Sequence, residues 1–382
     1  MKCILQDEEM SLIKKVELEG SKISGVSSLA QGVPWYGVPE PIQEFVMEKI
    51  RKGETNRYSI VPGIPELRQQ VALRYYKNNS VEVDFENEIV ITAGAIQAIS
   101  SVLLTILEKD EEVMLLDPCY ASYDGCIKLS RGNPVYSSLD ENLDIDVQDV
   151  LSKINSKTKA IIISNPNNPT GSIFTIEKIK QILDAIDGKD IYLILDEVYD
   201  EFLYDGNFFE SGINLYKKYK KNLILVNSWS KTFGMTGRRV GYFLADSNIT
   251  KEVLKVHDGL VTCAPVHSQW AALASFEIYD RWIGKVRKEL QKRRDYTIQE
   301  MNKLSSYIEF GTPKAAYFLF PRFKYTEKDY EECLKILHES KVALVPGSGF
   351  GNRGRGHFRI CFGRDFDDLS SGIEKLGKYF NK

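Results

Sequence analysis

The chain has 382 residues, and its 50 Lys and Arg nearly balance its 53 Asp and Glu, so that the net charge is −3. This length exceeds one ordinary compact core and suits a large domain with a smaller one, which leaves room for a cleft between them. Both signs of charge are mixed along the sequence, with no basic face and no acidic tail. Composition therefore argues against nucleic-acid binding and against disorder, and a small metabolite is the expected partner.

The N-terminal segment carries acidic residues where a signal peptide would have an apolar core, and the sequence contains no apolar run of about 18 residues. The six cysteines are scattered without a CxxC pair, which indicates reduced thiols rather than a disulfide scaffold. We therefore expect a soluble, cytoplasmic protein without membrane contact. The histidines lack metal-ligand spacing, so no metal site is expected; they are His257, His267, His338 and His357.

From about residue 86, short apolar runs alternate with longer stretches of helical period, which is typical of repeated β-α-β units. The runs are apolar on both faces, as strands buried between two helix layers are. The sequence therefore predicts an α/β domain with a mostly parallel sheet between helices. The predicted strands are 89–91, 113–116, 160–163, 191–195, 223–226 and 240–244.

A second, smaller α+β domain is predicted from about residue 280. A long charged helix over 282–303 is followed by a Gly/Pro turn, a strand over 316–320, a helix near 327–339 and two late strands. The first 45 residues lack the β-α-β rhythm and are expected to pack on this smaller domain. The predicted divisions are 1–45 for an N-terminal arm and part of the small domain, 46–280 for the large domain and 281–382 for the C-terminal small domain.

Polar clusters follow five of the predicted strands. Parallel α/β sheets bind ligands at the carboxyl ends of their strands, so these clusters should meet along one edge. The clusters are 92–95 (TAGA), 117–120 (DPCY), 164–171 (SNPNNPTG), 196–199 (DEVY) and 228–231 (SWSK).

Lys231 follows the run 223–226, lies between hydroxyls and a glycine, and has Arg238 and Arg239 close downstream. A lysine that is held near cations and away from bulk water has a lowered pKa, and its neutral amine can form an imine. The alternative is a solvated loop lysine, because most lysines are surface charges.

Asp196 ends the apolar run IYLIL, where an unpaired carboxylate would be costly to bury. An N-cap is one interpretation, since Asp is common where a strand leads into a helix. A partner for a pyridinium nitrogen is the other, because a carboxylate there keeps such a ring protonated as an electron sink. Tyr199, three residues on, would bring a phenol to the same site.

Two further segments suit a ligand with oxygen atoms. The loop 164–171 offers three asparagine amides, although Asn-Pro turns also occur in loops without function. Gly94 opens a helix whose free N–H groups suit a phosphate, together with Ser228, Ser230 and an arginine.

Arg359 lies in the late strand-like segment HFRICF. A planar guanidinium captures a carboxylate through two hydrogen bonds. A structural ion pair is the alternative interpretation.

Taken together, these motifs resemble the class I and II aminotransferases, which are pyridoxal-phosphate enzymes of fold type I related to aspartate aminotransferase. The resemblance extends from the segment around Gly32 to that around Arg359. The matching segments are 167–171 (NNPTG), 196–199 (DEVY), 228–237 (SWSKTFGMTG), Arg239 with 241–242 (GY), 346–348 (PGS) and 358–360 (FRI).

The resemblance implies a large domain that binds pyridoxal 5′-phosphate on a seven-stranded, mostly parallel sheet, a smaller α+β domain, and a homodimer with shared active sites. It implies amino-group transfer between an L-amino acid and a 2-oxo acid by a ping-pong mechanism. Lys231 would bind the cofactor covalently and move the proton at the substrate α-carbon. Asp196 would pair with the pyridine nitrogen, while Tyr199 and Asn168 would hydrogen-bond the phenolic oxygen of the ring.

The same resemblance assigns the remaining cofactor and substrate contacts. Tyr120 would stack on the ring. The phosphate would be held by Gly94, Ala95, Ile96, Ser228, Ser230 and Arg239, and by Tyr58 across a dimer interface. The substrate α-carboxylate would dock on Arg359, Asn168 and Gly32.

Two positions depart from the family pattern. Arg238 stands where relatives often have tryptophan, and the spacing from Lys231 favours Arg239 as the phosphate ligand. Ile96 stands where some aspartate-specific relatives have a lysine, which favours an apolar, aromatic or permissive side-chain pocket. Two other functions stay open: a same-fold enzyme for elimination, decarboxylation, cyclisation or oxidation of an amino acid, and a non-catalytic ligand-binding module.

Overall fold

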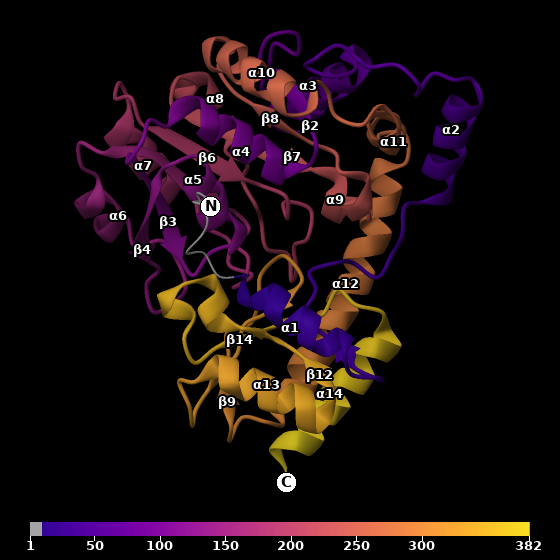
Figure 1. Ribbon diagram of the computed structural model, residues 1–382, viewed down its shortest axis with the longest axis vertical. Coiled ribbons are helices and arrows are strands. Elements are labelled where there is room, and N and C mark those ends of the chain that lie inside the picture. Colours follow the sequence, from indigo (N-terminus) through magenta and orange to yellow (C-terminus); the bar gives the residue numbers. More distant parts are fainter. Residues whose placement is uncertain (1–9, 382) are drawn as a thin grey trace, which may run out of the picture.

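The computed structural model describes residues 10–381. Figure 1 shows a large region around a central sheet and, below it, a small region, with the long helix α12 (Tyr279–Asn302) running between them. The large region contains the strands β2 to β8, and the small region contains the chain after α12 together with the N-terminal helix α1 (Leu12–Ser21). Expectations that fall on residues 1–9 and 382, such as that for Cys3, lie outside the described residues.

The large region is built on one seven-stranded sheet with the order β2-β8-β7-β6-β5-β3-β4. All strands run parallel to one another except β8 (Gly241–Leu244), which is antiparallel to both neighbours. The predicted α/β fold with a mostly parallel seven-stranded sheet is thus confirmed. The other strands are β2 (Ile89–Thr92), β3 (Glu112–Asp117), β4 (Asn133–Ser138), β5 (Thr158–Ser164), β6 (Tyr192–Asp196) and β7 (Leu223–Ser228).

Strand β4 is the sheet strand that no apolar run predicted. It lies at the edge of the sheet beside β3, and most of its residues are only partly buried. Pro134 is tolerated there because an edge strand needs no ladder hydrogen bond on its outer side. An edge strand with partial cover also does not need the continuous apolar pattern that reveals the central strands.

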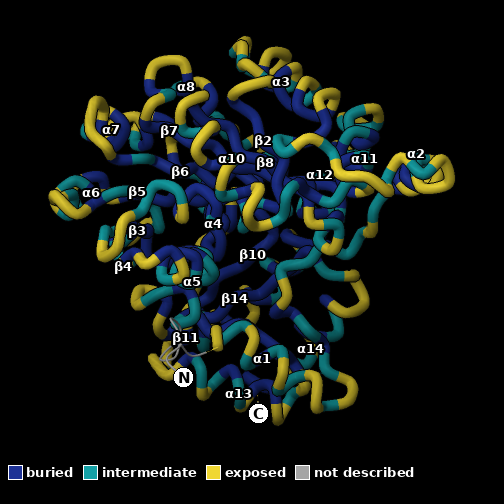
Figure 2. The backbone as a smooth tube through the Cα atoms, turned by 45° about the horizontal axis from the view of Figure 1, so that its top comes forward, coloured by how far each residue is buried: buried dark blue, intermediate teal, exposed yellow. Residues whose placement is uncertain are grey.

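Helices cover both faces of the sheet, because successive side chains of each strand point to opposite faces. Ile161 and Ile163 join one core, whereas Ala160 and Ile162 join the other. Figure 2 shows the central strands as buried segments beneath more exposed helices. The first core contains α2 (Glu40–Arg51), α3 (Pro65–Asn79), α6 (Val147–Lys153), α7 (Ile176–Ile186), α8 (Ile213–Tyr219) and α11 (Val266–Ser275); the second contains α4 (Ala95–Ile106), α5 (Ser122–Leu129) and α10 (Ser247–Val261).

The small region has short strands and two further helices. The N-terminal arm joins it through β1 (Ser27–Ser28), which pairs in parallel with β12 (Val342–Ala343). Three short late strands replace the two that we expected, because β12 pairs with β1 whereas β13 (Val345–Pro346) pairs with β14 (Phe358–Cys361). The other elements are β9 (Ile308–Glu309), β10 (Phe318–Leu319), β11 (Arg322–Phe323), α13 (Asp329–Ser340) and α14 (Phe366–Phe380).

Helices α12 and α13 lie within three residues of the bounds that the sequence predicted, 282–303 and 327–339. The domain boundaries after residues 45 and 280 stay predictions. Among residues 10–381, none of the helices combines the length and the apolar character that a membrane span requires.

Candidate active site

A cleft with a volume of about 350 Å³ lies at the carboxyl edge of the sheet, with walls from both regions. Because parallel strands end together at this edge, side chains that are far apart in the sequence meet there. The predicted residues that line the cleft are Gly32, Ala95, Ile96, Tyr120, Asn168, Asp196, Tyr199, Ser228, Ser230, Lys231, Arg239 and Arg359.

Two predicted residues do not line this cleft. Gly94 lies behind Arg239: a Cβ added to it would fall 2.5 Å from Arg239 Nη2, so a side chain there would displace the guanidinium. Tyr58 is 82% exposed and does not line the cleft of its own chain. Of the two adjacent arginines, Arg239 lines the cleft and Arg238 does not.

Lys231 belongs to the short helix α9 (Trp229–Thr232), which follows β7 directly. Its amine donates a hydrogen bond to the carbonyl of Gly32 at 2.8 Å. Burial lowers the pKa of Lys231 to about 8, and the positive charges of Arg359 and Arg239 act in the same direction. A fraction of the amine is therefore neutral near neutral pH, as an attacking amine must be.

The backbone that carries Lys231 is braced from two other segments. The Tyr36 hydroxyl donates to the carbonyl of Lys231 at 2.6 Å, and Trp282 Nε1 donates to the carbonyl of Thr232 at 2.8 Å. These bonds anchor the last turn of α9 to the N-terminal arm and to α12. The main chain is fixed by them, while the amine itself is held only by the Gly32 carbonyl.

Asp196 is the last residue of β6 and is only 5% exposed. Its Oδ2 accepts a hydrogen bond from the Tyr123 hydroxyl at 2.7 Å, and its Oδ1 accepts one from the Val198 N–H at 3.2 Å. Burial raises the pKa of Asp196 to about 6, against the opposing effect of these two hydrogen bonds. A cation at the remaining face of this carboxylate would restore its ordinary charge state.

Tyr123 was missed in the sequence. It lies in the first turn of α5, and Tyr120 lies just before the N-terminus of that helix, in the loop after β3. Their rings meet edge to face with centroids 5.4 Å apart. The polar cluster DPCY at 117–120 indicated Tyr120, whereas Tyr123 lies beyond the end of that cluster.

Arg359, in β14, is 3% exposed and reaches the cleft from the small region. Its Nη1 donates to Asn168 Oδ1 at 3.0 Å and its Nη2 to the Ala30 carbonyl at 2.6 Å, while Nε is buried without a partner. The guanidinium lies over the rings of Phe318 at 4.3 Å and Phe350 at 4.9 Å. No carboxylate among residues 10–381 forms an ion pair with it, which argues against the structural ion pair.

The opposite end of the cleft suits a phosphate. Helix α4 begins at Ala95 without any side-chain cap, so the N–H groups of its first turn are free to bind an anion. Gly241 of β8 lies against the start of α4. A side chain there would not fit, because a Cβ on Gly241 would fall 2.8 Å from the Ala95 nitrogen. The guanidinium of Arg239 and the hydroxyl-bearing residues Ser228 and Ser230 line the same end.

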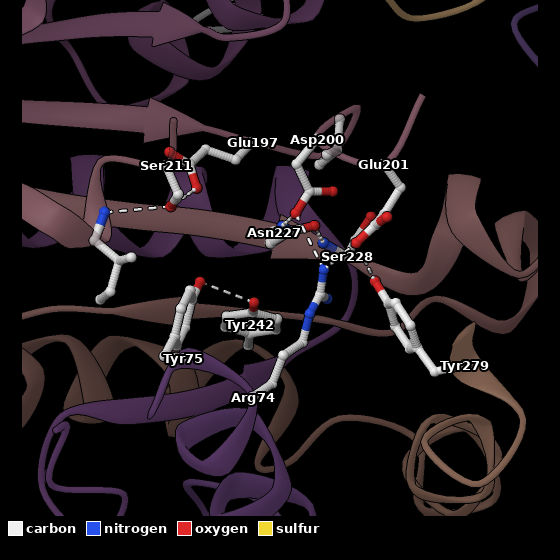
Figure 3. Close-up of polar contacts among 12 residues, drawn as sticks. Arg74, Tyr75, Glu197, Asp200, Glu201, Ser211, Asn227, Ser228, Tyr242 and Tyr279 are labelled. Atoms are coloured by element: carbon white, nitrogen blue, oxygen red, sulfur yellow. Dashed lines mark hydrogen bonds and ion pairs between the residues drawn. The ribbon is translucent and has the colours of Figure 1, made fainter. Parts of the chain in front are cut away.

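The reverse face of the turn after β6 holds a network of buried charges, drawn in Figure 3. Arg74, from α3, bonds Asp200 Oδ2 at 3.4 Å and also Glu201. Glu201 accepts a further hydrogen bond from the Tyr279 hydroxyl at 2.8 Å. Burial raises the pKa of Asp200 to about 7, with the charge of Arg74 opposing that rise. The Arg74 guanidinium thus pairs with two acidic residues of the turn that follows Asp196.

This network reaches the phosphate end of the cleft through Asn227. Asn227 Nδ2 donates to Asp200 Oδ2 at 3.0 Å, and its Oδ1 accepts from the Ser228 N–H at 2.7 Å. Glu197, in the same turn, accepts from the Ser211 hydroxyl at 2.6 Å, and burial raises its pKa to about 8. The backbone around both Asp196 and Ser228 is therefore fixed from behind.

Helix α1 contributes to the cleft in a way that the sequence did not reveal. Ser11, Ile13, Lys14 and Glu17 line it, and Lys14 Nζ pairs with Glu17 Oε2 at 2.7 Å. The segment carries no motif, and its expected role was to pack on the small region. Only the three-dimensional structure places it beside the site.

The fold and the site together define the class of pyridoxal-phosphate-dependent transferases of fold type I. A lysine amine, a buried carboxylate and an uncapped helix start surround one cleft at the carboxyl edge of a mostly parallel sheet.

A sequence profile described as "Aminotransferase class I and II" matches residues 25–376. The chain is 33% identical over 375 residues to aromatic-amino-acid aminotransferase 2 of Thermococcus litoralis, which covers 96% of this chain and 95% of that protein. It is 34% identical over 375 residues to an aspartate aminotransferase of Pyrococcus abyssi, with the same coverage. The solved aspartate aminotransferase of Thermus thermophilus with maleate has a TM-score of 0.91 and 26% identity over 99% of each chain.

The chain therefore belongs to the class I and II aminotransferase family, and it is an aminotransferase. The family uses pyridoxal phosphate. The resemblance, the fold class and the aminotransferase activity that the sequence predicted are confirmed. The relatives match over nearly their full length, which favours transamination over the other same-fold reactions and over a non-catalytic module.

Replacing Arg74 with methionine should destabilise the protein. The change removes the cation that Asp200 and Glu201 share. We expect the free energy of unfolding to fall by about 3 kcal/mol at neutral pH, because the buried Asp200 carboxylate loses the cation bonded to it and Glu201 keeps only the half-exposed Arg287. The loss should shrink as the pH falls, since the Asp200 carboxyl, whose pKa burial raises to about 7, can then be buried in the neutral form. Denaturant unfolding of the apo chain at several pH values measures it.

Arg287→Met is the matched control. Arg287 Nη2 also bonds Glu201, at 2.5 Å, but its side chain is 42% exposed. We expect this variant to lose less than about 1 kcal/mol. Equal losses in both variants would contradict a special role for Arg74.

The Lys231 amine should react with an acylating reagent at a lower pH than an ordinary lysine. We expect its labelling rate in the apo chain, followed by mass spectrometry, to be half-maximal near pH 8 rather than near the peptide pKa of about 10.4. Because the folded pKa lies below the unfolded one, the contribution of Lys231 to stability should improve as the pH rises between these two values.

Arg359→Met provides the internal check for this titration. It removes one of the positive charges that lower the pKa of Lys231, so the midpoint of labelling should move upward. A wild-type midpoint at the peptide value would show that the amine is not held away from water.

Proposed function

We propose that the chain binds pyridoxal 5′-phosphate in this cleft and transfers an amino group between an L-amino acid and a 2-oxo acid, which bind one after the other. The observation that carries the proposal is Arg359, a buried guanidinium that has no carboxylate partner within residues 10–381 and lines the same cleft as the Lys231 amine. Pyridoxal phosphate, when bound, supplies an aldehyde that takes up the amino group and a protonated ring that draws electrons from the substrate α-carbon.

The residues present fit that group at both ends. The free N–H groups of α4, the Arg239 guanidinium and two serines suit a phosphate dianion. Asp196 suits a protonated pyridine nitrogen, since its carboxylate is buried and meets only the Tyr123 hydroxyl and a backbone N–H. The proposed contacts are Gly94, Ala95, Ile96, Ser228, Ser230 and Arg239 for the phosphate, Asp196 for the ring nitrogen, Asn168 and Tyr199 for the phenolic oxygen, and Tyr120 for the ring face.

Lys231 would act twice in the reaction. Its neutral amine would hold the cofactor through the aldehyde, and the same amine would serve as the base that takes the proton from the substrate α-carbon. A pKa of about 8 suits this task, because a base works best when its pKa lies near the working pH. The bonds of Tyr36 and Trp282 to the backbone of α9 keep the amine near one position throughout.

Arg359 and Asn168 would hold the α-carboxylate of the substrate. The fork of the guanidinium gives two parallel hydrogen bonds to a carboxylate, and this fixes the orientation of the α-carbon as well as its position. Phe318 and Phe350 cover the guanidinium and exclude water, which strengthens the bond to a charged ligand. The Gly32 carbonyl, which bonds Lys231 in the apo chain, lies beside this subsite.

The substrate side chain is proposed to be neutral. Ile13, Val33 and Ile96 line the cleft, and the charge of Lys14, the lining cation not assigned to cofactor or α-carboxylate, is matched by Glu17. A distal carboxylate would have to break that pair. The two relatives named above are an aromatic-amino-acid aminotransferase and an aspartate aminotransferase. Measurement of kcat/KM for phenylalanine, tyrosine, leucine, aspartate and glutamate decides between the two kinds of substrate, and a preference for the acidic donors would contradict a neutral pocket.

Cofactor binding and donor conversion test the function directly. Wild-type protein with pyridoxal phosphate should show a visible absorbance band that a suitable amino donor removes and a 2-oxo acid restores. Lys231→Ala should lack the band and the activity, whereas Lys251→Ala, which alters an exposed lysine of α10, should keep both. If Lys231→Ala retains the band, Lys231 is not the residue that binds the cofactor.

We further propose a homodimer in which Tyr58 reaches the phosphate of the partner subunit. Tyr58 is 82% exposed, and Ile60, Met47 and Ile50 expose further apolar surface at 54%, 46% and 44%. Such surface suits burial against a second copy. Tyr58→Phe should weaken cofactor retention in an equilibrium titration without altering the dimer seen by sedimentation; unchanged retention would argue against the contact.

A cytoplasmic location is also proposed. The cysteines of the described part of the chain, Cys119, Cys126, Cys263, Cys333 and Cys361, are all free and buried. Reduced thiols are usual in the cytosol. Cell fractionation tests this, and recovery outside the cytosol would contradict it.

A further inference from the structure

A glycine-rich loop, residues 347–356 (GSGFGNRGRG), joins β13 to β14, the strand that carries Arg359. It contains the short helices η2 (Gly347–Phe350) and η3 (Asn352–Gly354). The two ends of the loop pack backbone against backbone, because a Cβ on Gly347 would fall 2.1 Å from the Gly354 carbonyl oxygen. The loop is therefore folded tightly and can transmit a displacement at one point to the start of β14.

The small region holds this loop through Asp329, the first residue of α13, which is 3% exposed. Asp329 Oδ2 accepts hydrogen bonds from the Ser348 N–H at 2.9 Å and the Gly356 N–H at 3.1 Å. Its Oδ1 accepts one from the Ser348 hydroxyl at 2.7 Å. All these bonds lie within the small region.

The large region holds the same loop through Asp117, the last residue of β3, which is also 3% exposed. Asp117 Oδ2 accepts from the Asn352 N–H at 3.0 Å, and Oδ1 accepts from the Arg353 N–H at 3.1 Å. Gly351 has a φ of +127°, and a Cβ on it would fall 2.1 Å from Asp117 Oδ1. Only a glycine lets the loop approach the carboxylate this closely.

A second bond lies next to this one. The Cys119 N–H donates to the Phe350 carbonyl at 2.9 Å, two residues beyond Asp117. Phe350 is one of the two rings that cover the Arg359 guanidinium, and Tyr120, which follows Cys119, lines the cleft. The contact therefore joins the wall of the cleft that carries Tyr120 to the wall that carries Arg359.

We propose that Asp117 is a positioning residue for the amino-acid substrate: by tying the loop 347–356 to the end of β3, it sets Arg359 at the right distance from Lys231. This inference rests on the proposed role of Arg359 as the site of the α-carboxylate. Bonds from a carboxylate to backbone N–H groups are stronger than those between neutral groups, so one acid can hold the loop against thermal motion. Without Asp117, Asp329 would still keep the loop folded, but the loop would be held to the large region only through the Cys119 N–H to Phe350 carbonyl bond and the bond from Arg353 Nε to Ser138 Oγ at 3.2 Å.

The experiment compares Asp117→Asn with Asp329→Asn, since both acids hold the same loop but, of the two, Asp117 alone belongs to the large region. In Asp117→Asn we expect the KM for the amino donor to rise about tenfold, the loss of roughly one charged hydrogen bond, with kcat and the Kd of pyridoxal phosphate changed by less than about twofold. In Asp329→Asn we expect lower thermal stability and a KM rise of no more than about twofold.

Hydrogen exchange in the apo chain tests the tie without relying on activity. Asp117→Asn should speed exchange at the Asn352 and Arg353 amides and leave those of Ser348 and Gly356 protected, and Asp329→Asn should give the reverse pattern. If wild-type protein transfers no amino group, the proposed function fails, while this exchange pattern still reports on the tie itself.

Gly351→Ala gives a second approach that leaves both acids in place. Its Cβ would push the loop away from the Asp117 carboxylate, so it should raise the donor KM in the same direction as Asp117→Asn. An unchanged KM in Asp117→Asn and Gly351→Ala, or equal rises in Asp117→Asn and Asp329→Asn, would overturn the positioning role.

Discussion

Arg359 is a buried cation that meets no carboxylate among residues 10–381, and much of the site is arranged around this imbalance. An uncompensated buried charge costs several kcal/mol, and the Asn168 amide, the Ala30 carbonyl and two aromatic rings offset only part of that cost. Under the proposed function, the substrate α-carboxylate would supply the compensating charge. The cost of burying Arg359 would then be the source of the affinity for an amino acid.

Burial also shifts the pKa values of Asp196 and Lys231, upward for the acid and downward for the amine. Burial raises the pKa of Asp196 to about 6 and lowers that of Lys231 to about 8, so each group is shifted toward its neutral form in the apo chain. Groups held in this way lower stability but need little reorganisation when ligand arrives. The network around Arg74, on the far side of the turn after β6, offsets part of this loss by fixing the backbone of the same turn.

The sequence predicted the parts of the protein that have a local signal. Central strands are apolar on both faces, and a polar cluster directly after such a strand indicates the ligand edge, so Lys231, Asp196 and Asn168 could be found without a structure. Strand β4 gave no such signal because it is an edge strand. Tyr123 and Asp117 act through partners distant in the chain, because Tyr123 bonds Asp196 and Asp117 accepts hydrogen bonds from the Asn352 and Arg353 N–H groups. Lys14 lines the cleft because α1 packs beside it. Bonds to distant backbone N–H groups and the packing of a distant helix leave no pattern in the local sequence.

The half-reaction in the absence of an acceptor tests amino-group transfer most directly. Protein loaded with pyridoxal phosphate is mixed with an excess of amino donor and no 2-oxo acid, and the products are measured per active site. A transaminase that uses Lys231 and Arg359 as proposed should release about one equivalent of 2-oxo acid and then stop until an oxo acid is added. Continued turnover without an acceptor, or release of ammonia or carbon dioxide in place of that single equivalent, would contradict the proposed reaction.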